Sequence, residues 1–538
     1  MKLLSLLLAI LLASCAVPAE LPDKPRLLVL LVVDGLPQRQ VLAWRDQFAP
    51  DGLARFLERG AWFPHAYFGH AYTVTAPGHA ALLTGAYPHR TGIIGNAWRD
   101  PLTGAEVYCA GDDSAVYIGH GTRALDGTSP KHLRAETLGD VLRRMDPRSK
   151  VLAVSGKDRG AILPAGKTGT AYIYMQQTGA FASSTFYMER HPAWVDRFNA
   201  GKPADRFFRT QWKPLLPEGA YADSPADRQR SRAGAVLPLT VGAAGEDAPG
   251  PAFYSSLRAS PFVDLLTLEF ARAAIAGERL GADDAPDILV VSLSGHDEVN
   301  HRWSAESQLS HDHLLQVDRM LQAFFRNLDQ AVGSGNYVAV LTADHGFMPS
   351  PEDSRSRGLD AGRINLSQAL ARINAGLAQR FGTGRWAIGS SASALLLNGP
   401  LIARQGLDRD SVADEARRLL LAEPGIAAAY TRRELLAGTR TGAPWFEAMR
   451  KSWHAQVSAD VQYTVKPYWM FGTAVATHGS PHPYDTNVPM LFYGPRWIKP
   501  GRMEQRIEVV DLAPTLARLL GVPAPSASEG RPLPLPVP

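Results

Sequence analysis

The chain has 538 residues, of which 45% are hydrophobic and 20% charged, and its formal net charge at pH 7 is +4. This composition is typical of a globular protein with a large core and excludes a disordered chain. Because 56 basic residues stand against 52 acidic ones and no long basic block occurs, we expect no nucleic-acid binding.

The first 19 residues predict an export signal. One lysine precedes an apolar run, Leu3–Leu12, which is shorter than the roughly 20 residues that span a membrane. The following Leu12-Ala13-Ser14-Cys15 is similar to the lipobox of bacterial lipoproteins, in which the cysteine is lipidated, and cleavage after Ala19 is the alternative. We therefore expect a protein in the periplasm, or held by a lipid anchor on the outer-membrane surface, of a Gram-negative-type bacterium. Both alternatives leave Cys109 without an intrachain disulfide partner.

Five apolar, β-branched runs predict strands that are buried on both faces. They lie at 26–35, 150–160, 287–297, 336–346 and 489–494, and helical patterns such as 136–145 and 313–328 come between them. This alternation predicts an α/β fold over residues 24–538, with a mostly parallel central sheet flanked by helices. Two segments, at about 185–265 and about 355–470, break the alternation and are expected to be inserted cap or accessory lobes.

The stretch Thr73–Gly85 predicts a helix whose first turn holds small residues. Thr75 is followed by Pro77 and Gly78, so a hydroxyl and free backbone N–H groups would face outward at the helix N-terminus. Such an N-terminus attracts phosphate. The alternative is that the threonine only caps the helix.

The carboxyl ends of the predicted strands carry polar and charged residues, and active sites of parallel sheets lie at that edge. Asp34 ends the first strand, and Lys157 and Arg159 follow the second. Asp297 and His301, four residues apart, would share one face of a helix and could bind one metal ion, although a surface pair is the simpler alternative.

Further ligand-type residues follow the next strand. Asp344, His345 and Gly346 would form a tight turn there, either as metal ligands or as a solvated turn, and His478 lies beside a glycine in a later loop. Together the three aspartates and three histidines could hold two divalent ions. The Thr75 hydroxyl could be a shared ligand, because a metal ion lowers the pKa of a hydroxyl and makes it a nucleophile.

Seven short motifs in this order resemble the alkaline phosphatase superfamily. They are D-G at 34–35, T-x-P-G-H at 75–79, G-N-x-W at 95–98, S-x-K-D-R-G-A-I-L-P at 155–164, D-x-x-x-H at 297–301, A-D-H-G at 343–346 and T-H-G-S-P at 477–481. The chain is similar in particular to the phosphate-irrepressible periplasmic alkaline phosphatases, which are related to the nucleotide pyrophosphatase/phosphodiesterases. The resemblance spans roughly residues 26–535.

The resemblance implies a site with two Zn²⁺ ions. The first zinc would be held by Asp34, Thr75, Asp344 and His345, and the second by Asp297, His301 and His478. Thr75 would form the covalent phospho-enzyme, and Asn96 would donate a hydrogen bond to a phosphoryl oxygen. Lys157 and Arg159 match the pair that the monoesterase branch adds. His79, His296 and His482 are expected beside the ligands and not among them.

These residues predict a two-zinc alkaline phosphomonoesterase of broad substrate range that scavenges phosphate from small monoesters. The alternative is a phosphodiesterase or nucleotide pyrophosphatase of the same superfamily, which Lys157 and Arg159 disfavour because a diester lacks the additional charge that they would bind. A sulfatase is disfavoured because position 75 is threonine and not cysteine or serine. A catalytically silent binding protein is disfavoured by the complete set of ligands and nucleophile. We expect a monomer.

Overall fold

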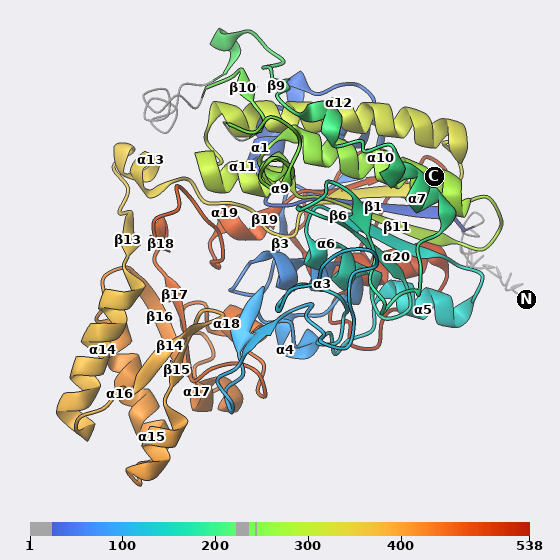
Figure 1. Ribbon diagram of the computed structural model, residues 1–538. Coiled ribbons are helices and arrows are strands. Elements are labelled where there is room, and N and C mark those ends of the chain that lie inside the picture. Colours follow the sequence, from blue (N-terminus) through green and yellow to red (C-terminus); the bar gives the residue numbers. More distant parts are fainter. Residues whose placement is uncertain (1–23, 222–235, 243–244) are drawn as a thin grey trace, which may run out of the picture.

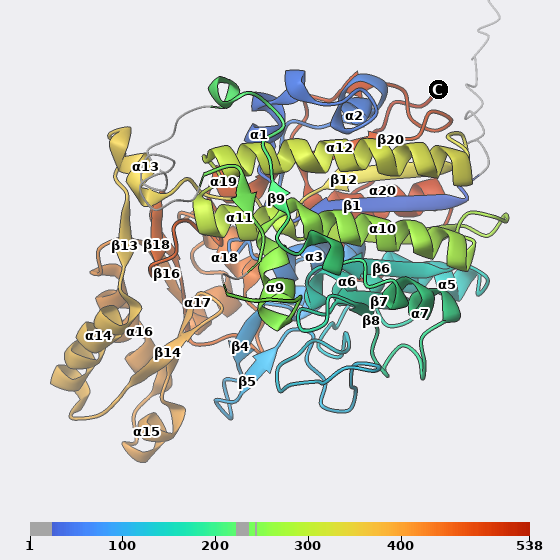
Figure 2. The same ribbon diagram turned by 45° about the horizontal axis from the view of Figure 1, so that its top comes forward.

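The computed structural model describes residues 24–221, 236–242 and 245–538 (Figure 1). The predicted export signal, including Cys15, lies outside these residues. A nine-stranded sheet forms the centre, in the order β21-β2-β20-β12-β1-β11-β6-β7-β8. Helices cover both faces of this sheet (Figures 1 and 2), so the predicted α/β fold is confirmed.

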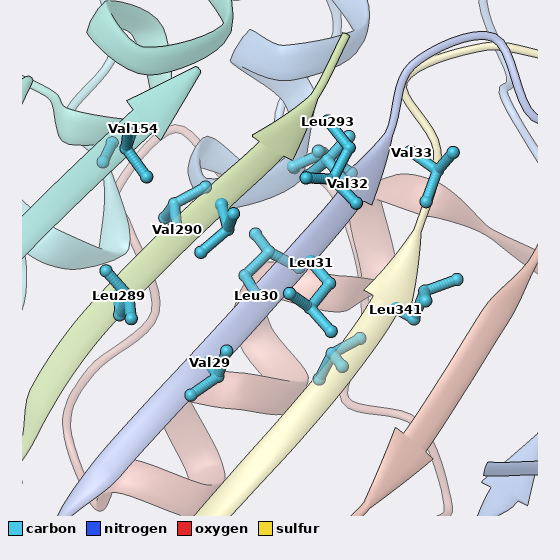
Figure 3. Packing of buried hydrophobic residues seen from close by; sticks show 14 of the residues in the cluster. Val29, Leu30, Leu31, Val32, Val33, Val154, Leu289, Val290, Leu293 and Leu341 are labelled. Carbon is cyan, nitrogen blue, oxygen red and sulfur yellow. The ribbon is translucent and has the colours of Figure 1, made fainter. Parts of the chain in front are cut away.

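Five parallel strands form the middle of this sheet. They are β12 (Tyr337–Thr342), β1 (Leu27–Val33), β11 (Asp287–Leu293), β6 (Val151–Ser155) and β7 (Thr170–Tyr174). Every residue of β1, β6, β11 and β12 is buried. Figure 3 shows apolar side chains of neighbouring strands packed together, among them Leu30, Val290 and Leu341. Continuous apolar runs occur here because helices exclude water from both faces.

The outer strands of the sheet are shorter and partly antiparallel. They are β20 (Met490–Tyr493), β2 (Ala61–Trp62), β21 (Gly501–Arg502) and β8 (Phe181–Ala182). The predicted strand at 489–494 is β20, which pairs antiparallel with β12. The sheet is therefore mostly parallel, with antiparallel pairing confined to its outer strands.

Long helices cover the sheet. On one face lie α10 (Pro261–Glu278), α11 (Gly295–Trp303) and α12 (Gln308–Ala331), and on the other lie α3 (Thr75–Thr84), α5 (Leu138–Met145), α6 (Asp158–Ala165) and α20 (Leu512–Leu520) (Figure 1). Shorter elements of the same body are α1 (Gln38–Ala43), α2 (Leu53–Arg59), β3 (Ala66–Tyr67), α4 (Pro88–Thr91), β4 (Ala97–Arg99), β5 (Glu106–Tyr108), α13 (Pro351–Ser356), α19 (Pro483–Thr486), β19 (Asn487–Val488) and β22 (Ile507–Glu508).

The segment expected to be an insertion at about 355–470 contains a second sheet with its own apolar core, which we call the lobe. It lies to one side of the central sheet, at the lower left of Figure 1. Its elements are β13 (Gly362–Ile364), α14 (Leu366–Phe381), β14 (Ala387–Ser391), β15 (Ala394–Leu397), α15 (Gly399–Arg404), α16 (Arg409–Leu421), β16 (Ile426–Thr431), α17 (Arg432–Ala437), α18 (Phe446–Ser452), β17 (Val461–Val465) and β18 (Trp469–Phe471).

In the described part of the other expected insertion, at about 185–265, the α-helices and strands that precede α10 are short. They are α7 (Ala193–Ala200), β9 (Gln211–Trp212), β10 (Leu239–Thr240) and α9 (Pro251–Ser256). The strands β9 and β10 pair with each other and not with the central sheet.

The buried side chain of His70, between β3 and α3, predicts that the free energy of unfolding falls at acid pH. His70 packs against Phe68 and Tyr87, with ring centroids 5.3 Å and 6.4 Å away, and neither ring nitrogen has a hydrogen-bond partner among the described residues. Burial lowers the pKa of His70 to about 3, and the positive charge of Lys451 acts in the same direction. Below about pH 6.5 the unfolded chain therefore binds a proton at His70. The folded chain binds that proton only when the pH approaches 3. The stability that a neutral His70 provides is complete above pH 6.5 and is lost as the pH falls towards 3.

We expect His70→Phe to reduce this loss. Between pH 7 and pH 5 the variant should lose about 2 kcal/mol less free energy of unfolding than the unchanged protein, from about 1.4 kcal/mol per pH unit below pH 6.5. Urea titrations at both pH values measure the difference. His65→Phe, at an exposed histidine, is the control and should leave the pH dependence nearly unchanged. Equal behaviour of the two variants would contradict the role given to burial.

Candidate active site

The predicted metal ligands gather at the carboxyl ends of the central parallel strands. Asp34 directly follows β1, Asp297 lies in the first turn of α11 after β11, and Asp344 and His345 follow β12. His478 comes from the loop before α19. The strand ends bring four residues from three distant parts of the sequence into one buried group, because parallel strands end at the same edge of the sheet.

Two groups of ligand atoms lie close enough to hold a metal ion. Asp34, Asp344 and His345 form one group, and Asp297, His345 and His478 form the other, with the ligand atoms of each group within 4.8 Å of one another. The remaining predicted ligand, His301, has its Nε2 atom 3.4 Å from Oδ1 of Asp297. All six predicted aspartate and histidine ligands therefore lie in one region, with His345 between the two groups.

The backbone fixes how the three histidines present their rings. The Nδ1 atoms of His301, His345 and His478 lie 3.1, 2.8 and 2.8 Å from the carbonyl oxygens of Ala476, Gly346 and Thr73. A carbonyl oxygen can only accept a hydrogen bond, so Nδ1 carries the proton and Nε2 of a neutral ring keeps a lone pair. The Nε2 atoms face the carboxylates, and that of His345 is 3.4 Å from Oδ1 of Asp34. Metal-binding histidines are oriented in this manner.

The carboxylates have unused bonding capacity. Oδ1 of Asp34, Oδ1 of Asp297 and Oδ2 of Asp344 are buried and have no hydrogen-bond partner among the described residues. Buried carboxylate oxygens are rarely left unpaired, because their desolvation is costly. A donor set of carboxylate oxygens and imidazole nitrogens fits divalent zinc, so the residues present suit the ions that the resemblance implies.

The buried carboxylates of the site lie close to positively charged side chains. The Nζ atom of Lys157 lies 2.7 Å from Asp34 Oδ2 and 2.5 Å from Asp297 Oδ2. Burial, the largest single influence, raises the pKa of both carboxyl groups, but Lys157 and the neighbouring histidines together outweigh it and hold both pKa values below their usual range. Burial lowers the pKa of His345, whereas Asp344 and Asp34 raise it, and the net effect raises the pKa to about 9. The carboxylates thus stabilise the positive charges of Lys157 and His345, whereas burial and the charge of His345 hold the pKa of His478 well below its usual value.

Thr75 is the first residue of α3 and lies against these ligands. Its Oγ1 atom is 3.5 Å from Nε2 of His345. The alternative that this threonine caps the helix is wrong, because Val74 is the N-cap residue and no side chain caps α3. The small residues of the first turn have a steric reason: a Cβ atom on Gly78 would lie 2.0 Å from the carbonyl oxygen of Asp344. Glycine there lets the helix N-terminus approach the strand end.

Asn96 and Arg159 both follow this helix in the sequence and have defined partners. Asn96 Oδ1 accepts a hydrogen bond of 2.8 Å from the backbone N–H of Ala76, in the first turn of α3. Arg159, in the first turn of α6, bonds through Nη1 to the hydroxyl of Tyr108 at 3.2 Å, and that hydroxyl donates to Asp158. The Lys157 side chain bonds to the carboxylates of Asp34 and Asp297 and not to Tyr108.

The three other histidines have structural partners. His79 lies 2.9 Å from both the carbonyl oxygen of Thr75 and Oγ of Ser292. His296 contacts Gln40 at 2.8 Å, and His482 contacts the carbonyl oxygen of Val465 at 2.9 Å.

Two residues of the site were not predicted. Tyr108 orients Arg159 from 51 residues away. Asp485 accepts a hydrogen bond of 2.9 Å from the N–H of Ser480 and so fixes the loop that carries His478. The first partnership leaves no pattern in the sequence, whereas the aspartate after His482-Pro483-Tyr484 is a local turn signal that could have indicated the second.

Comparison with known proteins identifies the family. The family model for type I phosphodiesterase / nucleotide pyrophosphatase matches residues 28–484. The chain belongs to this family. Alkaline phosphatase PhoV of Synechococcus elongatus is 32% identical, with 98% of this chain and 98% of PhoV covered. Alkaline phosphatase PafA of Elizabethkingia meningoseptica is 31% identical over 95% of this chain and 94% of PafA.

Two further likenesses are informative. A protein of Myroides odoratus named calcium-transporting ATPase is 31% identical over 96% of this chain and 95% of its own. The crystal structure of PafA matches this chain with a TM-score of 0.86 and 29% identity, over 95% of this chain and 99% of PafA.

Within the described ranges of the chain, no helix is both long and apolar enough to cross a membrane.

Proposed function

We propose that this protein is an exported alkaline phosphatase that hydrolyses phosphate monoesters with two zinc ions and a phosphothreonine intermediate. The observation that carries the proposal is the position of Thr75. Its hydroxyl lies at a helix N-terminus, beside a buried set of carboxylates and histidines whose free nitrogen atoms face one region. Relatives named alkaline phosphatase over nearly the whole chain support the same activity.

The ligands divide between the two ions as the resemblance implies. Asp34, Thr75, Asp344 and His345 would hold one zinc, and Asp297, His301 and His478 the other. Bound zinc supplies positive charge that favours the threonine alkoxide and stabilises the leaving oxygen. Because the pKa of His345 is raised to about 9, a metal ion must displace a proton from this ring, so the site holds metal better at alkaline pH.

The bond changes involve the chain's own nucleophile. The Oγ1 atom of Thr75 attacks phosphorus, the new O–P bond forms, and the bond to the organic oxygen breaks, so the alcohol leaves. Water then attacks the phosphothreonine, the Thr75–phosphorus bond breaks, and phosphate is released. The helix N-terminus and the amide of Asn96 bind phosphoryl oxygens in both steps. Asn96 is oriented for this by accepting from Ala76, which leaves its NH₂ group to donate.

Lys157 and Arg159 favour monoesters over diesters in this proposal. A monoester carries an additional charged oxygen, which two cations beside the reacting group stabilise. A crystallised variant of PafA, 28% identical to this chain, has one threonine, one asparagine, one lysine and one arginine substituted, the four residue types that we place here. The alternative is a phosphodiesterase or nucleotide pyrophosphatase, the activity for which the family is described.

One purified sample distinguishes these functions. We expect rapid turnover of p-nitrophenyl phosphate, much slower turnover of bis-p-nitrophenyl phosphate and slower still of p-nitrophenyl sulfate. A preference for the diester would support the alternative, and no turnover of any of the three would contradict an enzyme of this kind.

Metal removal tests the two-zinc site. We expect a chelator to abolish phosphatase activity and added zinc to restore it, because every proposed ligand is an aspartate, a histidine or Thr75. Elemental analysis should find about two zinc ions per chain. Asp297→Asn should lower that number, whereas Asp247→Asn, at an exposed carboxylate, should not. A fully active preparation without metal would contradict the proposal.

A further inference from the structure

A half-open cavity of about 310 Å³ lies between the lobe and the loop that carries His478. The catalytic body contributes Tyr72 and His478, and the lobe contributes Leu366, Ala392, Tyr463 and Phe471. His478 is a proposed zinc ligand, and its Nδ1 bonds to the carbonyl of Thr73, two residues before the nucleophile. The cavity therefore lies between the loop that carries His478 and the lobe, and Thr75 itself does not line it. Its size is in the range of small-molecule sites.

A hairpin turn of the lobe closes this cavity beside Asn96. Oγ of Ser391 accepts a hydrogen bond of 2.8 Å from the N–H of Arg99. A Cβ atom on Gly95, the neighbour of Asn96, would lie 3.2 Å from the Cβ of Ala392. The lobe thus touches the loop that positions Asn96.

The same turn has a strained backbone. Ala392 and Ser393 have φ values of 47° and 57°, in the left-handed region that favours glycine. Two bonds hold the turn in place: Ser393 Oγ donates to the carbonyl of Tyr463, and the N–H of Tyr463 donates to the carbonyl of Ser393, both at 2.9 Å. Such strain persists where the surrounding structure requires it, and it is frequent at ligand sites.

The lining of the cavity combines four aromatic rings with hydroxyl groups and the carboxyl group of Asp485. Tyr72, Tyr463, Trp469 and Phe471 supply rings, and the ring centroids of Tyr463 and Phe471 are 5.6 Å apart. The lining contains no lysine or arginine. Rings in this arrangement favour a flat apolar group over a charged or strongly hydrated one.

We propose that this cavity binds the organic group of the substrate and gives the enzyme a preference for phosphate monoesters of aromatic alcohols. The inference rests on the proposed phosphatase function and deepens it. The phosphoryl group lies at Thr75, and the aromatic group extends past His478 between Tyr72 and the lobe. The lobe is thus a determinant of specificity and takes no part in the bond changes.

The test fills the cavity from its rim. Leu366 lines the cavity and is 37% exposed, so Leu366→Trp adds a ring without disturbing the lobe core. The matched control is Leu421→Trp, at a leucine of the same lobe that is 39% exposed and does not line the cavity. For each variant kcat/KM is measured with phenyl phosphate and with methyl phosphate, and the ratio of the two removes differences in active concentration.

We expect Leu366→Trp to lower the ratio of phenyl to methyl phosphate about tenfold, with methyl phosphate turnover nearly unchanged. The control should keep the ratio of the unchanged protein. Inhibition gives a second readout: phenylphosphonate should bind about tenfold more weakly to Leu366→Trp, and methylphosphonate equally well. Phe471→Ala removes a ring from the cavity wall and should lower the same ratio, which provides a test if the tryptophan variant does not fold.

The outcomes separate this inference from the proposed function. If the unchanged protein hydrolyses both esters but Leu366→Trp and Leu421→Trp have the same ratio, the cavity does not bind the organic group and only this inference fails. If the unchanged protein hydrolyses neither ester, the proposed function itself is overturned.

Discussion

Thr75→Ala is expected to lower kcat/KM for p-nitrophenyl phosphate by about four orders of magnitude or more, because the attacking oxygen is lost. The fold should remain, since the hydroxyl caps no helix and its one polar contact in the described structure is with His345. Alanine also favours the helical conformation of this position. The measurement is steady-state turnover together with the urea midpoint of the variant.

A second threonine of the same helix provides the control. Thr84 is buried at the other end of α3, where its hydroxyl donates to the carbonyl of Ala80. Thr84→Ala should keep nearly full turnover and lose some stability. Near-normal activity of Thr75→Ala would mean that another group attacks phosphorus. In the unchanged protein, an acid quench during turnover should trap the phosphoryl group on Thr75.

Combined replacement of Lys157 and Arg159 by alanine is expected to reduce the preference for monoesters over diesters. Each charge-assisted contact contributes about 1.5–3 kcal/mol, so monoester kcat/KM should fall by about two to four orders of magnitude. Diester turnover should fall much less, because the substituted oxygen carries no full charge. The quantity to measure is the ratio of kcat/KM for p-nitrophenyl phosphate and bis-p-nitrophenyl phosphate.

The structure requires three controls for this experiment. Lys157 also neutralises Asp34 and Asp297, so its loss could disturb the metal site, and zinc content must be measured in the same variant. Arg159→Ala alone leaves that ion pair intact. Arg123→Ala removes an exposed cation from the wall of the cavity that Lys157 and Arg159 share, and should leave the ratio unchanged. Equal losses of monoester and diester turnover with less zinc would show that the pair supports the metals.

Much of this molecule follows from local patterns. The apolar runs at 26–35, 287–297 and 336–346 predicted central strands correctly, because strands buried on both faces need continuous apolar sequence. Their ends carry Asp34 and Asp344, so the edge of the sheet that holds the candidate site could be predicted as well. The predicted superfamily and the α/β fold are confirmed by the family match and by the likeness to PafA.

Contacts between residues far apart in the chain could not be predicted from the sequence. The lobe hairpin touches Gly95 through Ala392, almost three hundred residues along the chain, and nothing local encodes that approach. The antiparallel direction of β20 depends on how the chain returns from the lobe. The bond between Tyr108 and Arg159 joins the end of β5 to the first turn of α6, which meet only in the folded protein. The assignments of zinc, phosphothreonine and monoester preference stay predictions for the experiments above.

The three histidines that face the carboxylates receive their orientation from main-chain carbonyl groups. Every amino acid supplies such a carbonyl, so no side-chain substitution at Gly346, Ala476 or Thr73 removes the acceptor. The tautomer of each ring is thereby protected against point mutation and depends on the path of the backbone. Insertions or deletions in the loop from 473 to 479 would shift the Ala476 carbonyl and His478 together, so this loop should tolerate changes of residue far better than changes of length.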